Sequence, residues 1–288
     1  MDNKKNAILI TAYNDFEQLM QFCDFYVKYF DVFIHVDRKI PLPDEFIDFA
    51  KKRNIVLLSK YKINWGGIQH LFAVLDLLSI ACKKNYDRYH IISENTFLIK
   101  HPDELTKIFE KGKNYIGMVP VEGNTLLQDR FQYYWFQDLY NIRGKGSKVW
   151  HYVERLIYHI QKTFRVKRKL KYPYDYKGYL YCHPSHDFVM WVLQYVKEHP
   201  DYLKELRRCY IPEEFFFQNL IMISPFKETL VMDSMIYDVW DDAKRGFPAE
   251  LNMGDWKELQ ASNKAFARKF GSSSQELAKK VMSYLKEE

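Results

Sequence analysis

Cysteine is scarce in this chain, and its spacing excludes two common uses. The 288 residues include four cysteines, Cys23, Cys82, Cys182 and Cys209, which are widely scattered. They match neither a disulfide framework nor a zinc site, and they favour a reducing compartment. No run reaches the ~18 apolar residues of a membrane span. The segment that begins at Met1 runs directly into a strand-like stretch, which predicts no signal peptide. These absences together predict a cytoplasmic protein.

Several nucleotide-binding patterns are also missing. No G-x-G-x-x-G and no G-x-x-x-x-G-K-[ST] follows any predicted strand. Their absence argues against dinucleotide-binding dehydrogenases and P-loop NTPases. A D-x-D pattern, the usual metal anchor for nucleotide-sugar diphosphates, is absent as well.

Apolar residues make up 47% of the chain and aromatic residues 17%, so the protein is globular. The net charge of +6 is concentrated in one place. Ten lysines and arginines lie between Arg143 and Lys171 against a single acid, Glu154, so this stretch carries +9 and the remainder −3. A local basic patch implies a local partner or surface.

Short β-rich runs alternate with amphipathic runs over the first 120 residues. This alternation predicts an α/β fold with a mostly parallel sheet and helices on both faces. The predicted strands are Ala7–Thr11, Val32–Val36, Ile55–Leu58, Tyr89–Ser93 and Tyr115–Val119. The predicted helices between them are Phe16–Tyr29, Asp44–Lys52, Ile68–Lys84 and Pro102–Lys111.

Ligands of such sheets bind at the carboxyl ends of the strands, where polar residues stand in this sequence. Tyr13 and Asn14 follow the first strand, Asp37 the second, and Glu94 the fourth. Asp37 is placed to bond a ribose or a uracil edge, although an acid there is often a helix cap. Trp65-Gly66-Gly67 opens the third helix; its glycines permit a tight turn and close approach of a ligand, and a plain turn is the alternative.

The segment from Gly144 to Lys171 departs from this alternation. Apolar residues recur every three or four positions in it, which predicts an amphipathic helix with a basic tail. The default interpretation is a helix packed on the core with its cations in solvent. The alternatives are contact with an anionic membrane surface and nucleic-acid binding, which no RRM, KH or helix-turn-helix pattern supports. Further helices are predicted at Asp187–Glu198, Glu213–Met222, Asp255–Ala267 and Ser274–Lys286.

Two short sequence strings contain the residues that point to a chemical function. Ile211–Gln218 presents carboxylates at a helix start beside three phenylalanines, and Phe266–Phe270 supplies two cations. A base and a cationic clamp suit a sugar transferase that works without a metal ion. Each string also has an ordinary interpretation, since proline followed by acids is a common helix start and an Arg-Lys pair is common on helix surfaces.

Taken in order, six strings resemble the core-2/I-branching family of glycosyltransferases, which includes the peptide O-xylosyltransferases. They are ILITAYNDFEQL at Ile8–Leu19, FIHVDRK at Phe33–Lys39, NWGG at Asn64–Gly67, IISENTFLIK at Ile91–Lys100, PEEFFFQNLIMISPF at Pro212–Phe226 and FARKF at Phe266–Phe270. The resemblance implies a GT-A type fold, a nucleotide-sugar donor, inversion at the anomeric carbon and no divalent metal.

The resemblance also implies roles for residues. Glu214 would be the general base, made more basic by desolvation against the aromatic run. Lys269 would hold the diphosphate of the donor, with Arg245 as the second cation. Asp37 would bind uridine, and Trp65 and Gly66 match the family's WGG element.

Two regions depart from the family pattern. Ser93–Leu98 lacks the glycine, acid and proline of S-G-x-D-x-P, and Gly178–Cys182 replaces G-S-x-W-W. Acceptor-side candidates in and near these regions are Glu94, Tyr179, Tyr181 and Glu213. The donor sugar is therefore open between N-acetylglucosamine and a xylose-like sugar.

The prediction is one GT-A domain over residues 1–288, with a nucleotide-binding half at 1–120. The acceptor and catalytic half at 121–288 holds a basic amphipathic insertion at about 143–171. Animal members are anchored in the Golgi and carry disulfides, so this chain is more similar to a bacterial, cytoplasmic member, peripheral on the inner face of the plasma membrane. It would use a UDP-sugar and a glycan or glycolipid acceptor to build surface polysaccharide, with no metal cofactor and no nucleic acid partner. The alternatives are an inactive glycan- or membrane-binding relative and another nucleotide-dependent α/β transferase.

Overall fold

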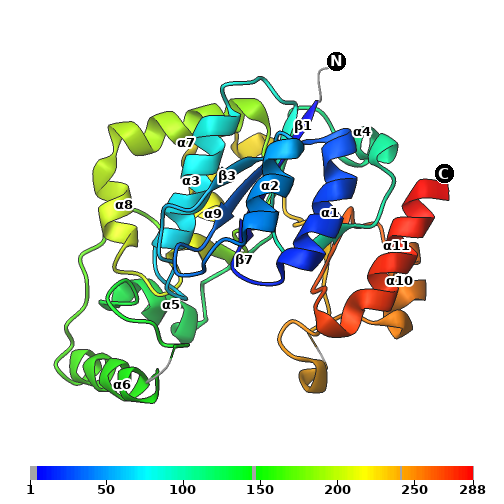
Figure 1. The fold of residues 1–288 in the computed structure, drawn as a ribbon. Helices are drawn as coiled ribbons and strands as arrows, with labels where there is room; N and C mark the ends of the chain where they lie inside the picture. The colour runs from blue at the N-terminus through cyan, green and yellow to red at the C-terminus, as the bar shows by residue number, and fades with distance from the viewer. Residues whose placement is uncertain (1–4, 145–146, 241, 288) are drawn as a thin grey trace.

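A four-stranded parallel sheet lies at the centre of the computed structural model, which describes residues 5–144, 147–240 and 242–287 (Figure 1). The strand order is β3-β2-β1-β4. The strands are β1 (Asn6–Ala12), β2 (Asp31–Val36), β3 (Val56–Leu58) and β4 (Arg88–Ser93). Met1–Lys4, on which the prediction of no signal peptide depends, and Lys145 of the basic segment lie outside the described residues.

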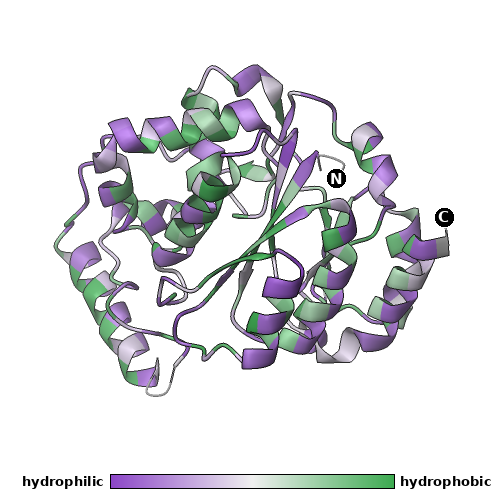
Figure 2. Cartoon of the chain, turned by 45° about the horizontal axis from the view of Figure 1, so that its top comes forward, coloured by the Kyte–Doolittle hydropathy of each residue, from purple (hydrophilic) through white to green (hydrophobic). Residues whose placement is uncertain are grey.

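Helices cover both faces of this sheet. Side chains alternate along β1, so that Ile8 and Ile10 face one layer while Ala7 and Leu9 face the other. The first layer contains α1 (Phe16–Tyr29), α2 (Asp44–Lys52) and α11 (Gln275–Glu287). The second contains α3 (Gln69–Ala81), α7 (His186–Glu198) and α9 (Phe216–Ile223). Figure 2 shows hydrophobic residues along the central strands between these layers. The predicted α/β class, with a mostly parallel sheet flanked by helices, is confirmed.

Three smaller sheets surround the central one. The first has the order β10-β11-β5, and the other two pair β6 with β9 and β7 with β8. Their strands are β5 (Thr96–Leu98), β6 (Asn114–Tyr115), β7 (Met118–Pro120), β8 (Tyr176–Gly178), β9 (Leu230–Val231), β10 (Ile236–Tyr237) and β11 (Phe266–Arg268). The remaining helices are η1 (Pro102–Glu104), α4 (Leu105–Ile108), α5 (Thr125–Gln132), α6 (Ser147–Thr163), α8 (Pro200–Leu206), η2 (Pro212–Glu214), η3 (Lys227–Thr229), η4 (Ala243–Arg245), η5 (Met253–Asp255), α10 (Trp256–Ala261) and η6 (Ser272–Ser274).

The predicted helix Asp255–Ala267 is wrong in its second half. Helix α10 ends at Ala261, and the hydroxyl of Ser262 accepts a hydrogen bond from the amide of Lys264. Serine favours such local bonds over helix continuation. The residues that follow form β11, which lies between β10 and β5 with Phe266 and Ala267 fully buried. Arg268 is the last residue of this buried strand and Lys269 follows it, so the Arg-Lys pair is not on a surface helix.

The predicted strand Tyr115–Val119 is divided into β6 and β7, and neither belongs to the central sheet. At the division, a Cβ on Gly117 would lie 2.9 Å from the Cβ of Ser234. The chain passes β8 even more closely, since a Cβ on Gly178 would lie 1.9 Å from the carbonyl oxygen of Gly117. Only glycines permit this crossing, which short-range sequence patterns do not reveal.

We expect Gly178→Ala to lower the free energy of unfolding by about 2–3 kcal/mol or more, because the backbone must move to admit a methyl group. Chemical denaturation monitored by circular dichroism measures it. Gly123→Ala is the matched control, since a Cβ there meets nothing within 4 Å and only its φ of +76° is unfavourable. A control loss of about 1 kcal/mol is expected. Equal losses in the two variants would contradict the close crossing.

Candidate active site

The strand order of the central sheet reverses between β1 and β4, and we call the region at the carboxyl ends of these two strands the crevice. The chain proceeds from β1 to β2 and β3 on one side and returns to β4 on the other. Ligands of open α/β sheets bind at such a reversal. Glu94, just after β4, spans it: its carboxylate accepts hydrogen bonds from the backbone amides of Tyr13, at 2.5 Å, and Asn14, at 2.9 Å. The loops after β1 and β4 are thereby joined.

Glu94 is only 5% exposed. Burial raises the pKa of its carboxyl group to about 7, against the opposing effects of the Asn14 and Tyr13 amides and of Lys269. This carboxyl group would change charge near neutral pH at the place where a ligand is expected.

Strand β11 brings cations to the same crevice. The guanidinium of Arg268 lies 4.8 Å from the ring centroid of Tyr181. The pKa of Tyr13 is raised by burial and by Glu94 and Tyr181, while Arg143 and Arg268 oppose the rise. These five side chains, from five segments of the chain, therefore share one electrostatic environment. Both cations of the FARKF motif were predicted to face a polyanion, and only Lys269 was assigned to the diphosphate.

Lys269 is half-buried, and its backbone carbonyl accepts a hydrogen bond of 2.9 Å from the amide of Leu251. Among the described residues its ammonium group has no ion-pair partner. The backbone thus fixes the residue and leaves the charge available, as an anion-binding lysine requires.

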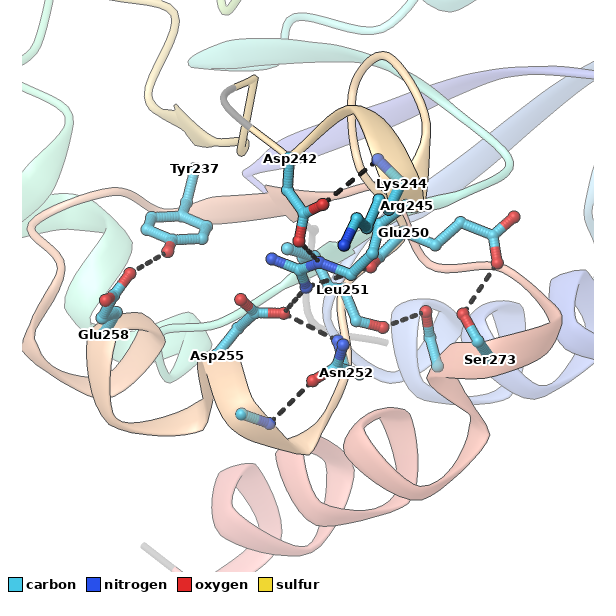
Figure 3. Close-up of polar contacts among 12 residues, drawn as sticks. Tyr237, Asp242, Lys244, Arg245, Glu250, Leu251, Asn252, Asp255, Glu258 and Ser273 are labelled. Atoms are coloured by element: carbon cyan, nitrogen blue, oxygen red, sulfur yellow. Dashed lines mark hydrogen bonds and ion pairs between the residues drawn. The ribbon is translucent and has the colours of Figure 1, made fainter.

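Arg245, the predicted second cation, is already engaged (Figure 3). Its guanidinium lies 2.7 Å from carboxylate oxygens of both Asp242 and Asp255, and it also donates to the carbonyl of Glu250. A diphosphate would have to compete with two carboxylates for this charge. Arg245 stays a predicted donor ligand, and Arg268 is the alternative that the geometry adds.

Glu214 lies at the end of η2 with its side chain 19% exposed. Its Oε2 is 2.8 Å from Nη1 of Arg130 and 3.4 Å from Nζ of Lys177. The phenylalanines that follow are fully buried in the second layer. The predicted surroundings of the carboxylate therefore differ from those observed: cations contact it, and the aromatic run packs into the core. Arg130 and Lys177 were missed because they lie far away in sequence and in no motif.

The WGG element, Trp65-Gly66-Gly67, contacts the residue that precedes η2. Gly66 has a φ of +78° and its carbonyl accepts a hydrogen bond of 3.1 Å from the amide of Ile211, the residue before η2. A Cβ at Gly66 would lie 3.2 Å from Cγ of Gln137, so a side chain has little room. Trp65 packs against Tyr210, and Arg143 lies 4.1 Å above its ring. Through this backbone hydrogen bond, Gly66 fixes the start of the turn that contains Glu214.

Glu213 contacts a histidine, and not the cations Arg130 and Lys177 that contact Glu214. It is 7% exposed, and its Oε1 is 3.4 Å from Nδ1 of His70, whose Nε2 is 2.9 Å from the hydroxyl of Thr11. Its Oε2 is buried without a hydrogen-bond partner among the described residues. This chain of polar groups connects η2 through α3 to the end of β1.

Asp37 lies at the end of β2 and is 5% exposed. Its Oδ1 accepts hydrogen bonds from the amides of Lys39, at 2.9 Å, and Ile63, at 3.1 Å, and its Oδ2 is 3.4 Å from Nζ of Lys39. The carboxylate therefore orders the two loops that border the crevice on the β2 and β3 side. Binding of uridine by Asp37 stays a prediction.

Aromatic side chains lie beside Glu214. Tyr179 stacks on Trp240 with the rings 6.1 Å apart and 10° from parallel, and Nζ of Lys177 is 5.5 Å from its centroid. Trp240 is 45% exposed and donates from its indole to Asp238. Tyr179 and Tyr181 are predicted from the sequence, whereas Trp240 is not, because only the fold of the loop after β10 brings it beside Tyr179.

The described residues contain no group of three or more His, Cys, Asp or Glu side chains arranged to hold a metal ion. Independence of metal stays a prediction about the reaction. No helix in the described ranges is both long and apolar enough to cross a membrane.

Comparison with known proteins agrees with the motifs. The model of the family described as Core-2/I-Branching enzyme matches residues 7–263, and the chain therefore belongs to this family of glycosyltransferases. Such enzymes use a nucleotide-sugar donor and a glycan acceptor. No curated protein matches the chain. A solved structure, that of 4-diphosphocytidyl-2C-methyl-D-erythritol synthase, is 9% identical over 77% of this chain and 97% of that one, and its TM-score of 0.34 is too low to be informative.

We expect the buried carboxyl of Glu94 to make stability depend on pH. Its folded pKa of about 7 exceeds the ordinary 4.5, so between these values the unfolded chain releases a proton that the folded chain keeps. Stability is therefore lost as pH rises through this window. Relative to the parent, Glu94→Gln should gain about 2 kcal/mol at pH 8 and almost nothing at pH 4.5, as measured by chemical denaturation. Glu122→Gln, at an exposed position, should change neither value, and an equal gain at both pH values would contradict the assignment.

Proposed function

We propose that the chain is an inverting, metal-independent glycosyltransferase of the GT-A type. It would move an N-acetylglucosamine or xylose-like sugar from a UDP-sugar to a hydroxyl of a glycan or glycolipid in bacterial surface polysaccharide synthesis. Residues 1–120 would form the nucleotide-binding half of one domain, and residues 121–288 the acceptor and catalytic half.

The observation that carries this proposal is that the carboxylate of Glu214 and the guanidinium of Arg268 both act on one side chain, that of Tyr179. Burial raises the pKa of Tyr179, Asp238 adds to the rise, and both Arg268 and Glu214 also act on it, in opposite directions. Tyr179 therefore lies within electrostatic range of the Glu214 side and of the β11 side. A base and an anion site in one place match the two charges that a transfer from a sugar diphosphate develops.

The proposed reaction is a single displacement. Glu214 accepts the proton of the acceptor hydroxyl while that oxygen forms a bond to the anomeric carbon of the sugar. The bond from this carbon to the phosphate oxygen breaks, and the nucleoside diphosphate leaves with an added negative charge. Lys269, with Arg268 or Arg245, stabilises that charge. One displacement inverts the configuration at carbon 1.

The cations at Glu214 have two consequences for this proposal. Arg130 and Lys177 hold the carboxylate in one orientation, which favours a defined line of attack. They also compete for the lone pairs that a base must offer, so the acceptor hydroxyl must displace or share one of them. This competition is the observation that favours the alternative of an inactive glycan-binding relative.

We expect Glu214→Gln to lower turnover by about 100-fold or more, since general bases contribute about 10²–10⁴-fold. The affinity for UDP should change less than about twofold, because the amide is isosteric with the carboxylate and the proposed role of Glu214 is toward the acceptor hydroxyl. Rates with a panel of UDP-sugars and acceptors, together with UDP titrations, measure both quantities. Glu228→Gln, at an exposed position, is the control. Collapse of UDP affinity in Glu214→Gln would assign a structural role to Glu214, and full turnover would remove it from catalysis.

Calorimetric binding of UDP, GDP and CMP with excess EDTA tests the clamp, that is, the proposed binding of the diphosphate by Lys269 and a second cation without a metal ion. UDP should bind in EDTA, and Lys269→Ala should weaken binding about tenfold or more, the effect of one charge-assisted hydrogen bond. Lys257→Ala, which removes an exposed cation on α10, should leave the affinity unchanged. Comparing Arg268→Ala with Arg245→Ala identifies the second cation. Binding that requires manganese would contradict the clamp.

A further inference from the structure

Helix α6 lies at the edge of the molecule, away from the central sheet (Figure 1). Its contact with the protein combines aromatic packing, in which Tyr158 stacks on Trp135, with buried polar side chains. Glu154 and Gln161 are each 7% exposed, and Gln137 donates a hydrogen bond to Glu154. Gln161 accepts from the backbone amide of Tyr134 at 2.8 Å and donates to its carbonyl at 3.0 Å.

The opposite face of α6 is apolar and lies in solvent. We call it the α6 stripe; it comprises Val149, Tyr152, Leu156, Ile160 and Phe164, which are 64%, 73%, 61%, 47% and 73% exposed. Their spacing of three or four residues places them in one row along the helix. An amphipathic helix of a soluble protein turns such a row to the core, so this helix is inverted.

Exposed cations accompany the stripe. Lys148 and Arg155 lie on the helix, and Arg165, Lys167 and Lys169 are exposed just beyond its end. The only acid of the segment, Glu154, is buried on the other side. Arg168 belongs to the body of the protein instead, because its guanidinium donates to the carbonyl of Phe131. An apolar row bordered by cations, with no exposed acid, is complementary to an anionic lipid surface.

We propose that the α6 stripe docks on an anionic lipid bilayer, with its apolar side chains among the acyl chains and the cations at the headgroups. This goes beyond the general expectation of a basic segment, because it assigns the contact to one face of one helix and makes the apolar side chains essential.

The docking would bring the acceptor side of the proposed active site to the membrane, an extension that rests on the proposed function. Asp129 of α5 accepts hydrogen bonds from Tyr158 of α6 and, at 3.0 Å, from Lys162. The next residue, Arg130, binds Glu214. Glu214 is thus connected to α6 through two adjacent residues of one helix, a placement suited to a lipid-linked glycan acceptor.

Flotation with vesicles tests the docking without donor or acceptor. We expect the full chain to bind vesicles of phosphatidylcholine with phosphatidylglycerol in low salt, and to bind vesicles of phosphatidylcholine alone about tenfold less well. The double variant Leu156→Glu/Phe164→Glu should bind the anionic vesicles at least about tenfold less well than the parent. The matched control is Met190→Glu/Met232→Glu, which places the same charges at residues 46% and 56% exposed outside α6, and it should bind like the parent.

Two further measurements separate the contribution of the cations to vesicle binding from that of the apolar stripe, and separate vesicle binding from the proposed catalysis. Arg155→Gln/Arg165→Gln/Lys167→Gln/Lys169→Gln should remove the preference for anionic vesicles. Glu214→Gln should bind vesicles like the parent, so that a failure of the proposed chemistry leaves the docking result intact.

Several results would overturn the docking proposal. They are no binding by the parent in low salt, equal binding by Leu156→Glu/Phe164→Glu, and a dimer in light scattering that this variant dissociates. The last result would assign the stripe to a second copy of the chain. Thermal unfolding of each variant, at positions already exposed, should match the parent and verifies that a loss of binding is not a loss of fold.

Discussion

The site depends on the pairing of β1 with a parallel strand on each side, β2 and β4. Because both neighbours run in the same direction as β1, the ends of three strands meet at one edge, and the connections that leave them diverge. The loops after β1 and β4 therefore border an open crevice, and the buried carboxyl of Glu94 joins them across it. Each other part of the candidate site is positioned against this frame: η2 through Gly66, and β11 through its pairing with β5.

The electrostatics of the crevice are divided between the two sides. On one side, Glu214 is held by Arg130 and Lys177, so the carboxylate is oriented and its charge is neutralised before any substrate arrives. On the other side, the Lys269 ammonium has no carboxylate partner among the described residues, and the Arg245 guanidinium has two. A polyanionic donor would find an unneutralised cation at β11 and a closed ion-pair network at η4. This difference makes β11 the more suitable anchor for a diphosphate.

Helix α6 shows how an inverted helix remains attached to a protein. Hydrogen bonds from Gln137 and the backbone of Tyr134 satisfy its buried polar side chains. The ring of Trp150 stacks on Tyr140 at 4.7 Å. These hydrogen bonds and ring contacts hold the inner face of the helix, because buried polar groups are tolerated when they are hydrogen-bonded. The apolar side chains of the α6 stripe stay 47–73% exposed, and an exposed apolar row of this kind is typical of an interaction surface.

Periodicity and turn chemistry determined the local elements of this protein. The helices Phe16–Tyr29 and Asp44–Lys52 match their predicted bounds, and four predicted strands form the central sheet. These elements follow from side-chain spacing and from the residues that end them, which are properties of adjacent positions. The ordered motifs likewise identified the family, which the match over residues 7–263 shows.

The tertiary structure decided which side chains meet. Three features depend on segments far apart in sequence: the contact of Arg130 and Lys177 with Glu214, the engagement of Arg245 by two carboxylates, and a strand where the end of the predicted helix Asp255–Ala267 was expected. The same is true of α6: its composition shows that it is amphipathic, but only the neighbouring segments determine which face is buried. A single sequence gives the side chains but not which distant side chains contact them. The tertiary structure therefore decides the ion pairs and the burial of each charged group.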